Sequence, residues 1–313
     1  MKSKLILVTG GLGFIGKHFV ERCLALGHFV TNVDVVNYAA DRYANDKFKA
    51  HENYRHLQQD IAALDHLPES DFLVNFAAES HVDNSIADNR KFCLSNIMGM
   101  QRLLELTRSK HATGAPHFVQ ISTDEVYGDI KEGRHKETAI LKPSNPYSAT
   151  KAAADMLLLG WVRTYGLTYS IVRMTNNYGP NQFPEKLIPK SAWRMRRGLP
   201  ALMHGDGSYI RSWLHVEDSV DAILTIMEKG TPNTVYNVHG NAEFQNIEVI
   251  KKLAAILDIP ESEAFITIPN RVGQDIRYNL DDTKIRALGW APRRDFDTEL
   301  SKIAVEDDFK RFL

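Results

Sequence analysis

The sequence predicts an α/β protein built on a doubly wound parallel sheet, with a smaller, partly interleaved C-terminal lobe. Short, continuously apolar runs alternate with amphipathic helical patterns through the first half of the chain, which is typical of a parallel sheet covered on both faces. A glycine-rich turn follows the first apolar run. After Arg173 the pattern changes to glycine and proline clusters without steady alternation, which predicts a second lobe.

The elements of the predicted sheet domain follow one another in a regular order. A possible further strand precedes Asp60, and the polar segment 35–56 is expected to be a loose loop. Ligands of such sheets bind at the carboxyl ends of the strands. We expect strands at 5–9, 29–34, 72–78, 117–122 and 169–173, and helices at about 15–26, 96–110 and 147–165.

We place the boundary between the two parts at about residue 175. Residues 1–175 form the predicted nucleotide-binding domain, and residues 176–313 form the predicted substrate-binding lobe. The run TVYNV, 234–238, is rich in β-forming residues and predicts a strand that returns to the first sheet. The two lobes are therefore expected to interleave.

Composition excludes several classes of function. The 313 residues carry 38 Lys and Arg against 39 Asp and Glu, a formal net charge of -1, so no one-signed field attracts nucleic acid or an anionic membrane. Cys23 and Cys93, both in predicted helices, indicate a reducing compartment rather than a disulfide. No signal-peptide pattern or apolar run of membrane-spanning length is visible, and no histidine has metal-ligand spacing, so we expect a cytoplasmic protein without a metal site.

The turn after the first strand reads TGGLGFIG, residues 9–16. Gly10, Gly13 and Gly16 allow a tight turn, close approach of a pyrophosphate and packing of helix on strand, and the free amides at the helix start face the anion. The pattern alone is weak, because a glycine-rich turn can also bind nothing. In its strand and helix context it predicts a dinucleotide site of the Rossmann type.

Asp34 ends the second strand, 18 residues after Gly16. An acid at this position accepts hydrogen bonds from the adenosine ribose and repels a 2′-phosphate, which favours NAD over NADP. The alternative is an aspartate that caps the following turn. Asp60 and Ile61, after the possible third strand, are weaker candidates for the adenine side.

Tyr147 and Lys151, in PYSATK, lie four residues apart on a predicted helix and so share one face. A neighbouring ammonium lowers the pKa of a phenol, and the phenolate could then take a proton from a sugar hydroxyl. The pair could equally be an ordinary surface contact. Together with the glycine loop, the catalytic interpretation is the better one.

The stretch STDEVYG, 122–128, places Asp124 beside Glu125 at the end of a buried strand. Adjacent carboxylates repel each other and are costly to remove from water, so the pair is either solvated or arranged for acid and base chemistry. Successive residues of a regular strand point to opposite faces, so the strand must end or twist at Thr123 if both acids are to reach one ligand.

Taken together, TGGLGFIG, AAESHVDNSI (77–86), STDEVYG, YSATK and NNYGPNQFPEKLIP (176–189) resemble the extended short-chain dehydrogenase/reductase family. Within it the chain is similar to the nucleotide-sugar 4,6-dehydratases, with the dTDP-glucose enzymes nearest in pattern. The resemblance runs from about residue 4 to residue 290. Its most specific element is the Thr-Asp-Glu triplet, because related epimerases lack the acid pair.

The resemblance implies an NAD-dependent dehydration of dTDP-glucose or UDP-glucose. Tyr147, aided by Thr123 and Lys151, would deprotonate the carbon 4 hydroxyl as NAD takes the hydride. Glu125 would then remove the carbon 5 proton, Asp124 would protonate the departing carbon 6 hydroxyl, and hydride would return to carbon 6. Acid and base roles require the pKa values of the two carboxyls to be pushed apart.

The resemblance also implies the binding residues and a homodimer. The dimer would pair the helices near 96–110 and 147–165, whose apolar stripes could equally face the core of a monomer. The nucleotide sugar would be held by Ser80, Thr123, Asn176, Lys186, Leu187, Arg211, Asn246 and Arg271, and NAD would lie near Phe14, Ile15, Ala77, Ala78, Ser95, Asn177 and the glycine loop.

Some positions depart from the family pattern or have an ordinary interpretation. Gln274 stands where a histidine is usual, Ala40 replaces a glycine, and the chain ends at DDFKRFL, 307–313, without the usual aromatic-rich tail. These departures leave the nucleobase open. His81 is expected to be a hydrogen-bonded structural residue, and RMRR, 194–197, a solvated helix face.

Three alternatives remain at this point. The enzyme could be a nucleotide-sugar 4-epimerase or another nucleotide-sugar dehydratase. The chain could also be a non-catalytic protein that senses the dinucleotide.

Overall fold

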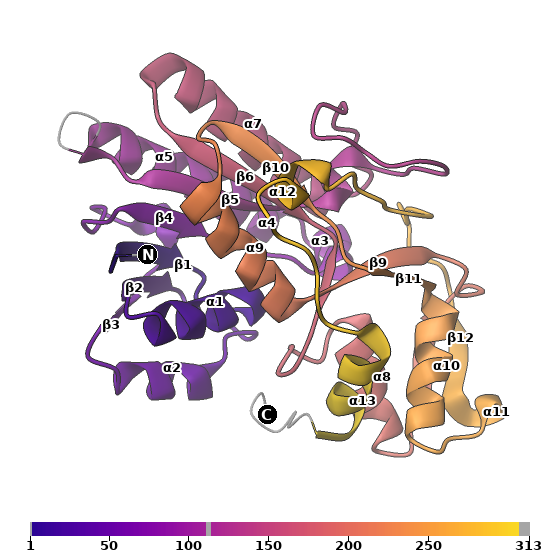
Figure 1. Cartoon of the computed structure of the whole chain (residues 1–313). Helices are drawn as coiled ribbons and strands as arrows, with labels where there is room; N and C mark the ends of the chain where they lie inside the picture. Colours follow the sequence, from indigo (N-terminus) through magenta and orange to yellow (C-terminus); the bar gives the residue numbers. More distant parts are fainter. Residues whose placement is uncertain (1, 111–113, 307–313) are drawn as a thin grey trace.

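The computed structural model describes residues 2–110 and 114–306 and confirms the predicted fold class (Figure 1). Within these residues, seven strands form one sheet, and all its neighbouring strands are parallel. Their spatial order is β10 (Thr234–Val238), β6 (Tyr169–Met174), β5 (His117–Thr123), β4 (Phe72–Asn75), β1 (Leu5–Thr9), β2 (Phe29–Asp34) and β3 (Tyr54–Gln58). The order reverses between β4 and β1, and ligands bind outside the carboxyl ends of the strands at such a point.

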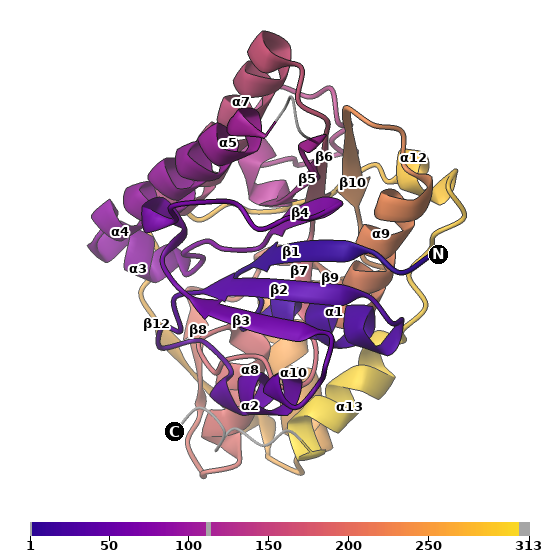
Figure 2. The same ribbon diagram turned by 90° about the vertical axis from the view of Figure 1, so that its left-hand side faces the viewer.

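Helices pack on both faces of the sheet (Figure 2). Along β1, Leu7 points into one apolar core and Val8 into the other, so the strand is apolar on both sides. One core includes residues of α1 (Phe14–Ala25), α2 (Arg42–Lys49) and α9 (Val216–Lys229), and the other residues of α5 (Met100–Ser109) and α7 (Pro146–Tyr165).

The second half of the chain returns to the large sheet. Strand β10 pairs in parallel with β6, with Tyr236 opposite Val172. Helix α9 packs against α1, and Ile285 of α12 (Thr283–Arg286) and Trp290 join the same apolar core. Segments beyond residue 213 therefore complete the first lobe.

The second lobe has its own apolar core beside the large sheet (Figure 1). Tyr178, Trp213 and Phe296 meet there as a group of aromatic rings. A three-stranded sheet contains β7 (Asn176–Tyr178), β9 (Ile210–His215) and β11 (Ala242–Gln245), and a two-stranded sheet contains β8 (Ala201–His204) and β12 (Phe265–Ile268). The helices are α8 (Leu187–Met195), α10 (Asn246–Ile256), α11 (Glu261–Ala264) and α13 (Phe296–Glu306).

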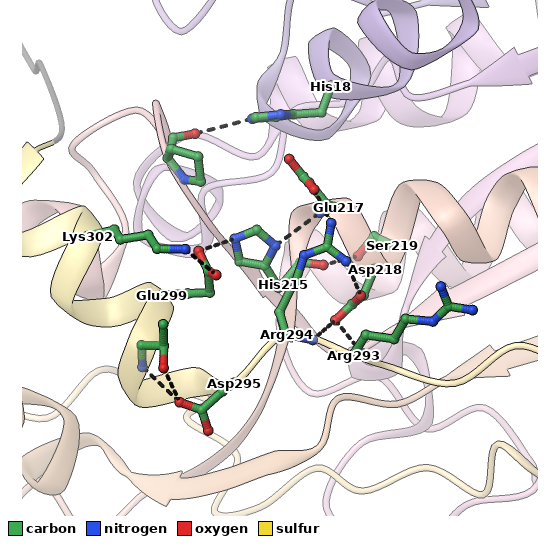
Figure 3. A network of polar contacts seen from close by, with 12 residues as sticks. His18, His215, Glu217, Asp218, Ser219, Arg293, Arg294, Asp295, Glu299 and Lys302 are labelled. Atoms are coloured by element: carbon green, nitrogen blue, oxygen red, sulfur yellow. Dashed lines mark hydrogen bonds and ion pairs between the residues drawn. The ribbon is translucent and has the colours of Figure 1, made fainter. Parts of the chain in front are cut away.

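A polar network joins the two lobes where α9 begins (Figure 3). Asp218 accepts hydrogen bonds from the backbone amides of Arg293 and Arg294, both at 3.0 Å. His215 lies 3.7 Å from Glu299 of α13. Because α9 packs on the large sheet and α13 on the second core, these contacts tie the two cores together.

The segment expected to be a loose loop, 35–56, is ordered, so that prediction was wrong. It contains α2, which Asp41 caps by accepting from the amide of Ala44 at 2.9 Å. Asp41 also forms a buried ion pair with Lys17 of α1, at 2.8 Å. Only Ala44 and Phe48 give this short helix an apolar face, which is too little for a sequence pattern to reveal.

Two other predicted elements differ at their ends. The helix expected at 96–110 begins as a π-helical segment, η2 (Cys93–Gly99), and continues as α5. Two short helices, α3 (Val82–Ala87) and α4 (Arg90–Phe92), precede it. Strand β4 ends at Asn75, whose amide nitrogen donates to Gln120 at 2.8 Å, and the chain then leaves the sheet. No helix among the described residues is long and apolar enough to cross a bilayer.

Candidate active site

A cavity of about 690 Å³ lies at the carboxyl ends of the central strands and is lined by both lobes. It brings together every site residue predicted from the sequence. The catalytic candidates are Thr123, Asp124, Glu125, Tyr147 and Lys151, and the cofactor candidates are Gly10, Gly13, Phe14, Ile15, Gly16, Asp34, Asp60, Ile61, Ala77, Ala78, Ser95 and Asn177. The substrate candidates are Ser80, Asn176, Lys186, Leu187, Arg211, Asn246 and Arg271.

The glycine loop has the shape that a pyrophosphate requires. Gly10 has a φ of +69°, and a Cβ there would lie 2.7 Å from the Cα of Ala77, so only glycine fits. A Cβ on Gly16 would lie 2.3 Å from the carbonyl oxygen of Gly10. No described side chain caps α1 at Gly13, so the first amides of this helix remain available to an anion.

Asp34 is fixed against the glycine loop. Its carboxylate accepts from the amides of Leu12 and Val36, at 2.9 and 2.8 Å. Burial raises the pKa of Asp34, and these two hydrogen bonds oppose the rise. Asp60 lines the same end of the cavity and also caps the short helix η1 (Ile61–Ala63).

The chain leaves the sheet at Thr123, as the acid pair requires. Strand β5 ends there and a 3₁₀ turn, η3 (Asp124–Tyr127), follows. The Thr123 hydroxyl donates to Asp124 Oδ1 at 3.0 Å and accepts from the amide of Glu125 at 3.3 Å. Because the two acids belong to a turn and not to a strand, both can line one cavity.

The two carboxyl groups have different surroundings. Burial, and then the neighbouring Glu125, raise the pKa of Asp124 to about 8. Its buried Oδ2 has no hydrogen-bond partner among the described residues. Burial also raises the pKa of Glu125, but Asn145 donates to its Oε2 at 3.2 Å. The charges of Arg211 and Lys186 further favour the ionised form of Glu125.

Tyr147 and Lys151 share one face of α7 and line the cavity, as predicted. Burial, and then Glu125, raise the pKa of Tyr147, and a hydrogen bond with Thr123 opposes this. The predicted lowering of the Tyr147 pKa is therefore absent from this state. Burial of the phenol is the first cause of this difference. Lys151 Nζ donates to the carbonyl oxygen of Ile121 at 2.6 Å, and burial lowers the pKa of Lys151 to about 8.

The predicted cations of the second lobe are already paired within the protein. Lys186 donates to the carbonyl oxygen of Ser80 at 2.7 Å, and Arg271 forms an ion pair with Asp83. Arg211, only 8% exposed, donates to the carbonyl oxygen of Asp275 at 3.0 Å. A bound diphosphate would have to replace or add to these contacts.

The remaining polar candidates line the same cavity. Asn177 accepts from Ser219 of α9, which links it to the polar network of Figure 3. Asn176 has a buried amide oxygen without a described partner, and so does Gln274, which also lines the cavity. Both oxygens can accept hydrogen bonds from a ligand.

His81 and the segment RMRR, 194–197, were expected to be structural or surface residues without a role in the site. His81 caps α3 through its Nδ1, so it is a hydrogen-bonded structural residue as predicted. In RMRR, Arg196 and Arg197 are exposed, but Met195 is buried in the second core, so only part of the segment is a solvated face. The C-terminal segment 307–313 lies outside the described residues.

Sequence analysis missed three residues around the site. Asn145 precedes α7, and the capping preference for asparagine could have indicated its position. Asp155, one turn after Lys151, is buried and pairs with Arg173 at 2.9 Å, and its charge favours the Lys151 ammonium. Asp275 lies in the segment VGQDIRY, and only the tertiary contact reveals its place in the cavity.

Comparison with known proteins identifies the family. A family profile described as GDP-mannose 4,6 dehydratase matches residues 7–303. The chain belongs to this family. It is 42% identical to a dTDP-glucose 4,6-dehydratase of Streptomyces niveus over 92% of this chain and 88% of that protein. It is 38% identical to a trifunctional UDP-glucose 4,6-dehydratase of Arabidopsis thaliana, over 96% of this chain and 47% of that longer protein.

A solved structure supports the same family assignment. The dTDP-glucose 4,6-dehydratase DesIV from Streptomyces venezuelae, with NAD bound, is 37% identical and has a TM-score of 0.90, with 96% of this chain and 95% of that chain covered. These likenesses confirm the family, the enzyme class of NAD-dependent nucleotide-sugar 4,6-dehydratase, and the cofactor predicted from the sequence.

The last two glycines of the loop, Gly13 and Gly16, should respond differently to substitution by alanine. Gly13 has a φ of -70°, and an added Cβ would meet only the carbonyl oxygen of Gly10, at 3.3 Å. We expect Gly13→Ala to fold normally but to bind NAD at least about tenfold more weakly, because the methyl group enters the space of the pyrophosphate. Gly16→Ala should lower the thermal midpoint, because its Cβ would clash with backbone.

The measurements are thermal denaturation and the NAD content of each purified variant, followed by titration with NAD. An undiminished NAD affinity in Gly13→Ala would contradict the placement of the pyrophosphate at this loop.

Proposed function

We propose that this enzyme converts dTDP-glucose or UDP-glucose to the 4-keto-6-deoxy sugar by oxidation at carbon 4, elimination of water across carbons 5 and 6, and reduction at carbon 6. One observation carries the proposal. A buried carboxyl with a pKa of about 8, Asp124, adjoins a second carboxyl, Glu125, that accepts an amide hydrogen bond, and both share a cavity with Tyr147 and Lys151. Elimination needs such a proton donor and acceptor at one sugar.

Residues of the first lobe hold the cofactor. The amides at the start of α1 take the pyrophosphate, and Asp34 accepts from the adenosine ribose. Ser95, together with Asn177 from β7 of the second lobe, lines the same cavity and would lie near the cofactor. NAD held there would supply the hydride acceptor for carbon 4 and, once reduced, the hydride donor for carbon 6.

Tyr147 takes the proton of the carbon 4 hydroxyl. Because a charged carboxylate nearby raises the pKa of this phenol, the phenolate is favoured when Asp124 is neutral and Lys151 is charged. Asp155 supports that charge on Lys151. The acid form of Asp124 therefore assists the first step as well as the second.

Elimination follows at carbons 5 and 6. The 4-keto group makes the carbon 5 proton acidic, Glu125 removes it, and Asp124 gives its proton to the departing hydroxyl, so that water leaves. Glu125 returns its proton to carbon 5 as carbon 6 is reduced. After one turnover Tyr147 has gained a proton and Asp124 has lost one. Thr123 is hydrogen-bonded to both residues and is placed to pass the proton from Tyr147 back to Asp124.

The second lobe holds the nucleotide. Arg211, Arg271 and Lys186 bind the diphosphate, since guanidinium groups match phosphate oxygens in a forked geometry. Ser80, Asn176, Leu187 and Asn246 surround the sugar. Relatives that act on dTDP-glucose and on UDP-glucose are about equally similar to this chain, and both nucleotides remain substrates of the proposal.

We also propose that the enzyme is a homodimer that works in the cytoplasm. Leu94 and Met98 of η2 and Met156 of α7 are 50%, 51% and 48% exposed, and the helices that carry them pack side by side. Burying such apolar area against a second copy would be favourable. A cytoplasmic site agrees with Cys23 and Cys93, which form no disulfide.

Loss of either carboxyl should stop dehydration. We expect Asp124→Asn and Glu125→Gln each to reduce turnover by about 10²- to 10⁴-fold, because each removes a proton-transfer group, while the fold is kept. Nuclear magnetic resonance of the products from dTDP-glucose and UDP-glucose measures this, with Glu132→Gln, an exposed acid, as control. A product that keeps its carbon 6 hydroxyl would indicate an epimerase and contradict the proposal.

Activity should decline above about pH 8. Asp124 is protonated below its raised pKa of about 8 and loses its proton above it, and Lys151 loses its charge in the same range. Both losses slow the reaction, so turnover at saturating substrate should fall as pH rises through 8. Turnover that stays constant to about pH 9.5 would show that neither group acts as proposed.

The apolar patch of Leu94, Met98 and Met156 should hold the dimer. We expect the double variant Met98→Glu, Met156→Glu to be monomeric in size-exclusion chromatography with light scattering, because four charges cannot be buried together. Ile266→Glu, at a side chain 49% exposed on β12, is the control and should leave the mass unchanged. A monomeric parent protein would contradict the dimer.

A further inference from the structure

Asn145 stands where α7 begins, and the helix cap fixes how its side chain is turned. Its side-chain Oδ1 accepts from the backbone amide of Ser148 at 2.9 Å, and the backbone N–H of Asn145 donates to the Ser148 hydroxyl at 3.2 Å. Only the oxygen of the side-chain amide can accept from a backbone N–H. The nitrogen, Nδ2, must therefore point away from the helix.

That nitrogen points at the second carboxyl of the acid pair. Asn145 Nδ2 donates to Glu125 Oε2 at 3.2 Å. Asn145 is 8% exposed and lines the cavity, so little water competes for this contact. The residue that starts the helix of Tyr147 and Lys151 thus also contacts the carboxyl proposed to take the carbon 5 proton.

The contact affects the two carboxyls unequally. A hydrogen bond given to a carboxylate favours its ionised form. Glu125 receives an amide donor, whereas Asp124 Oδ2 is buried without a described partner. The other charged and titratable groups that act on or with Glu125 are Asp124, Tyr147, Lys186, Arg211, Asp275 and Tyr278.

The second lobe holds the turn that carries Asn145. Ser144 donates to Asp275 Oδ2, and Tyr278 donates to the same oxygen at 2.5 Å. Asp275 lies near Glu125 and its negative charge opposes ionisation of that carboxyl. Without the hydrogen bond from Asn145, the charges of Arg211 and Lys186 would be left to offset both burial and the charge of Asp275 at Glu125.

We propose that Asn145 is a positioning residue that assigns the acid and base roles, by orienting Glu125 and holding it ionised so that Asp124 keeps the shared proton. The inference rests on the proposed dehydration. It goes beyond the catalytic roles implied by the family resemblance, which are limited to Thr123, Asp124, Glu125, Tyr147 and Lys151.

The test separates the cap from the donor. Asn145→Ser keeps a good helix cap and removes the amide donor, and Asn145→Asp keeps the cap and places an acidic oxygen toward Glu125. Ser148→Ala is the matched control, because it removes one cap contact and leaves the hydrogen bond from Asn145 to Glu125. The thermal midpoint of each full-length variant measures how much stability the helix cap contributes.

Single-turnover experiments with the NAD-loaded enzyme report the two chemical steps. Absorbance at 340 nm follows oxidation of carbon 4, and deuterium exchange at carbon 5 follows the action of Glu125. We expect Asn145→Ser to slow carbon 5 exchange about 10- to 100-fold, the scale of a hydrogen bond to a charged group, with oxidation changed less than about threefold. Asn145→Asp should slow the exchange further.

The pH dependence of the carbon 5 exchange rate shows in which direction the pKa of Glu125 moves. Glu125 must be ionised to act, and loss of its donor raises its pKa, so the acid limb of the carbon 5 exchange rate should move to higher pH in both variants. Equal slowing of oxidation and exchange, or exchange at the parental rate and pH, would overturn the role of Asn145 while product formation by the parent enzyme upholds the dehydratase. Failure of the parent to form the 4-keto-6-deoxy product would instead overturn the proposed function and this inference with it.

Discussion

Two adjacent carboxyl groups stand at the end of β5, with Asp124 buried and Glu125 partly buried, and the other features of the site depend on this arrangement. Two buried carboxylates would repel each other strongly, so the pair is stable only if one keeps its proton and the charge of the other is compensated. Asp124 satisfies the first condition through its raised pKa. The surroundings of Glu125 satisfy the second.

The compensation comes first from the side-chain amide of Asn145 and then from two cations outside the nucleotide-binding lobe. Arg211 and Lys186 belong to the second lobe, and Asn145 sits on a turn that the second lobe holds through Asp275. The ionised state that we propose for Glu125 therefore depends in part on groups that the second lobe contributes or holds. The network between α9 and α13 and the return of β10 to the large sheet hold the two lobes together (Figure 3).

The charge of the protein is organised locally. A formal net charge of -1 gives no long-range attraction for a diphosphate, yet Arg211, Arg271 and Lys186 converge on one cavity. Without ligand they are satisfied by carbonyl groups and by Asp83, which keeps these buried or partly buried cations from destabilising the fold. A diphosphate can take over these contacts because it offers more charge and more acceptor oxygens.

Local patterns in the sequence determined the parallel sheet, the glycine loop, the position of Asp34 and the shared helix face of Tyr147 and Lys151, because period and spacing alone set these features. Helix α2 escaped prediction because its stability comes from the Asp41 cap and the buried pair with Lys17. Tertiary structure alone decided that Lys151 contacts Ile121 and that Asn145 contacts Glu125, since these atoms come from distant segments. The sequence by itself therefore determined which groups we propose for the reaction, and the tertiary structure decided their pKa values, because these depend on burial and on neighbours that are separated along the chain.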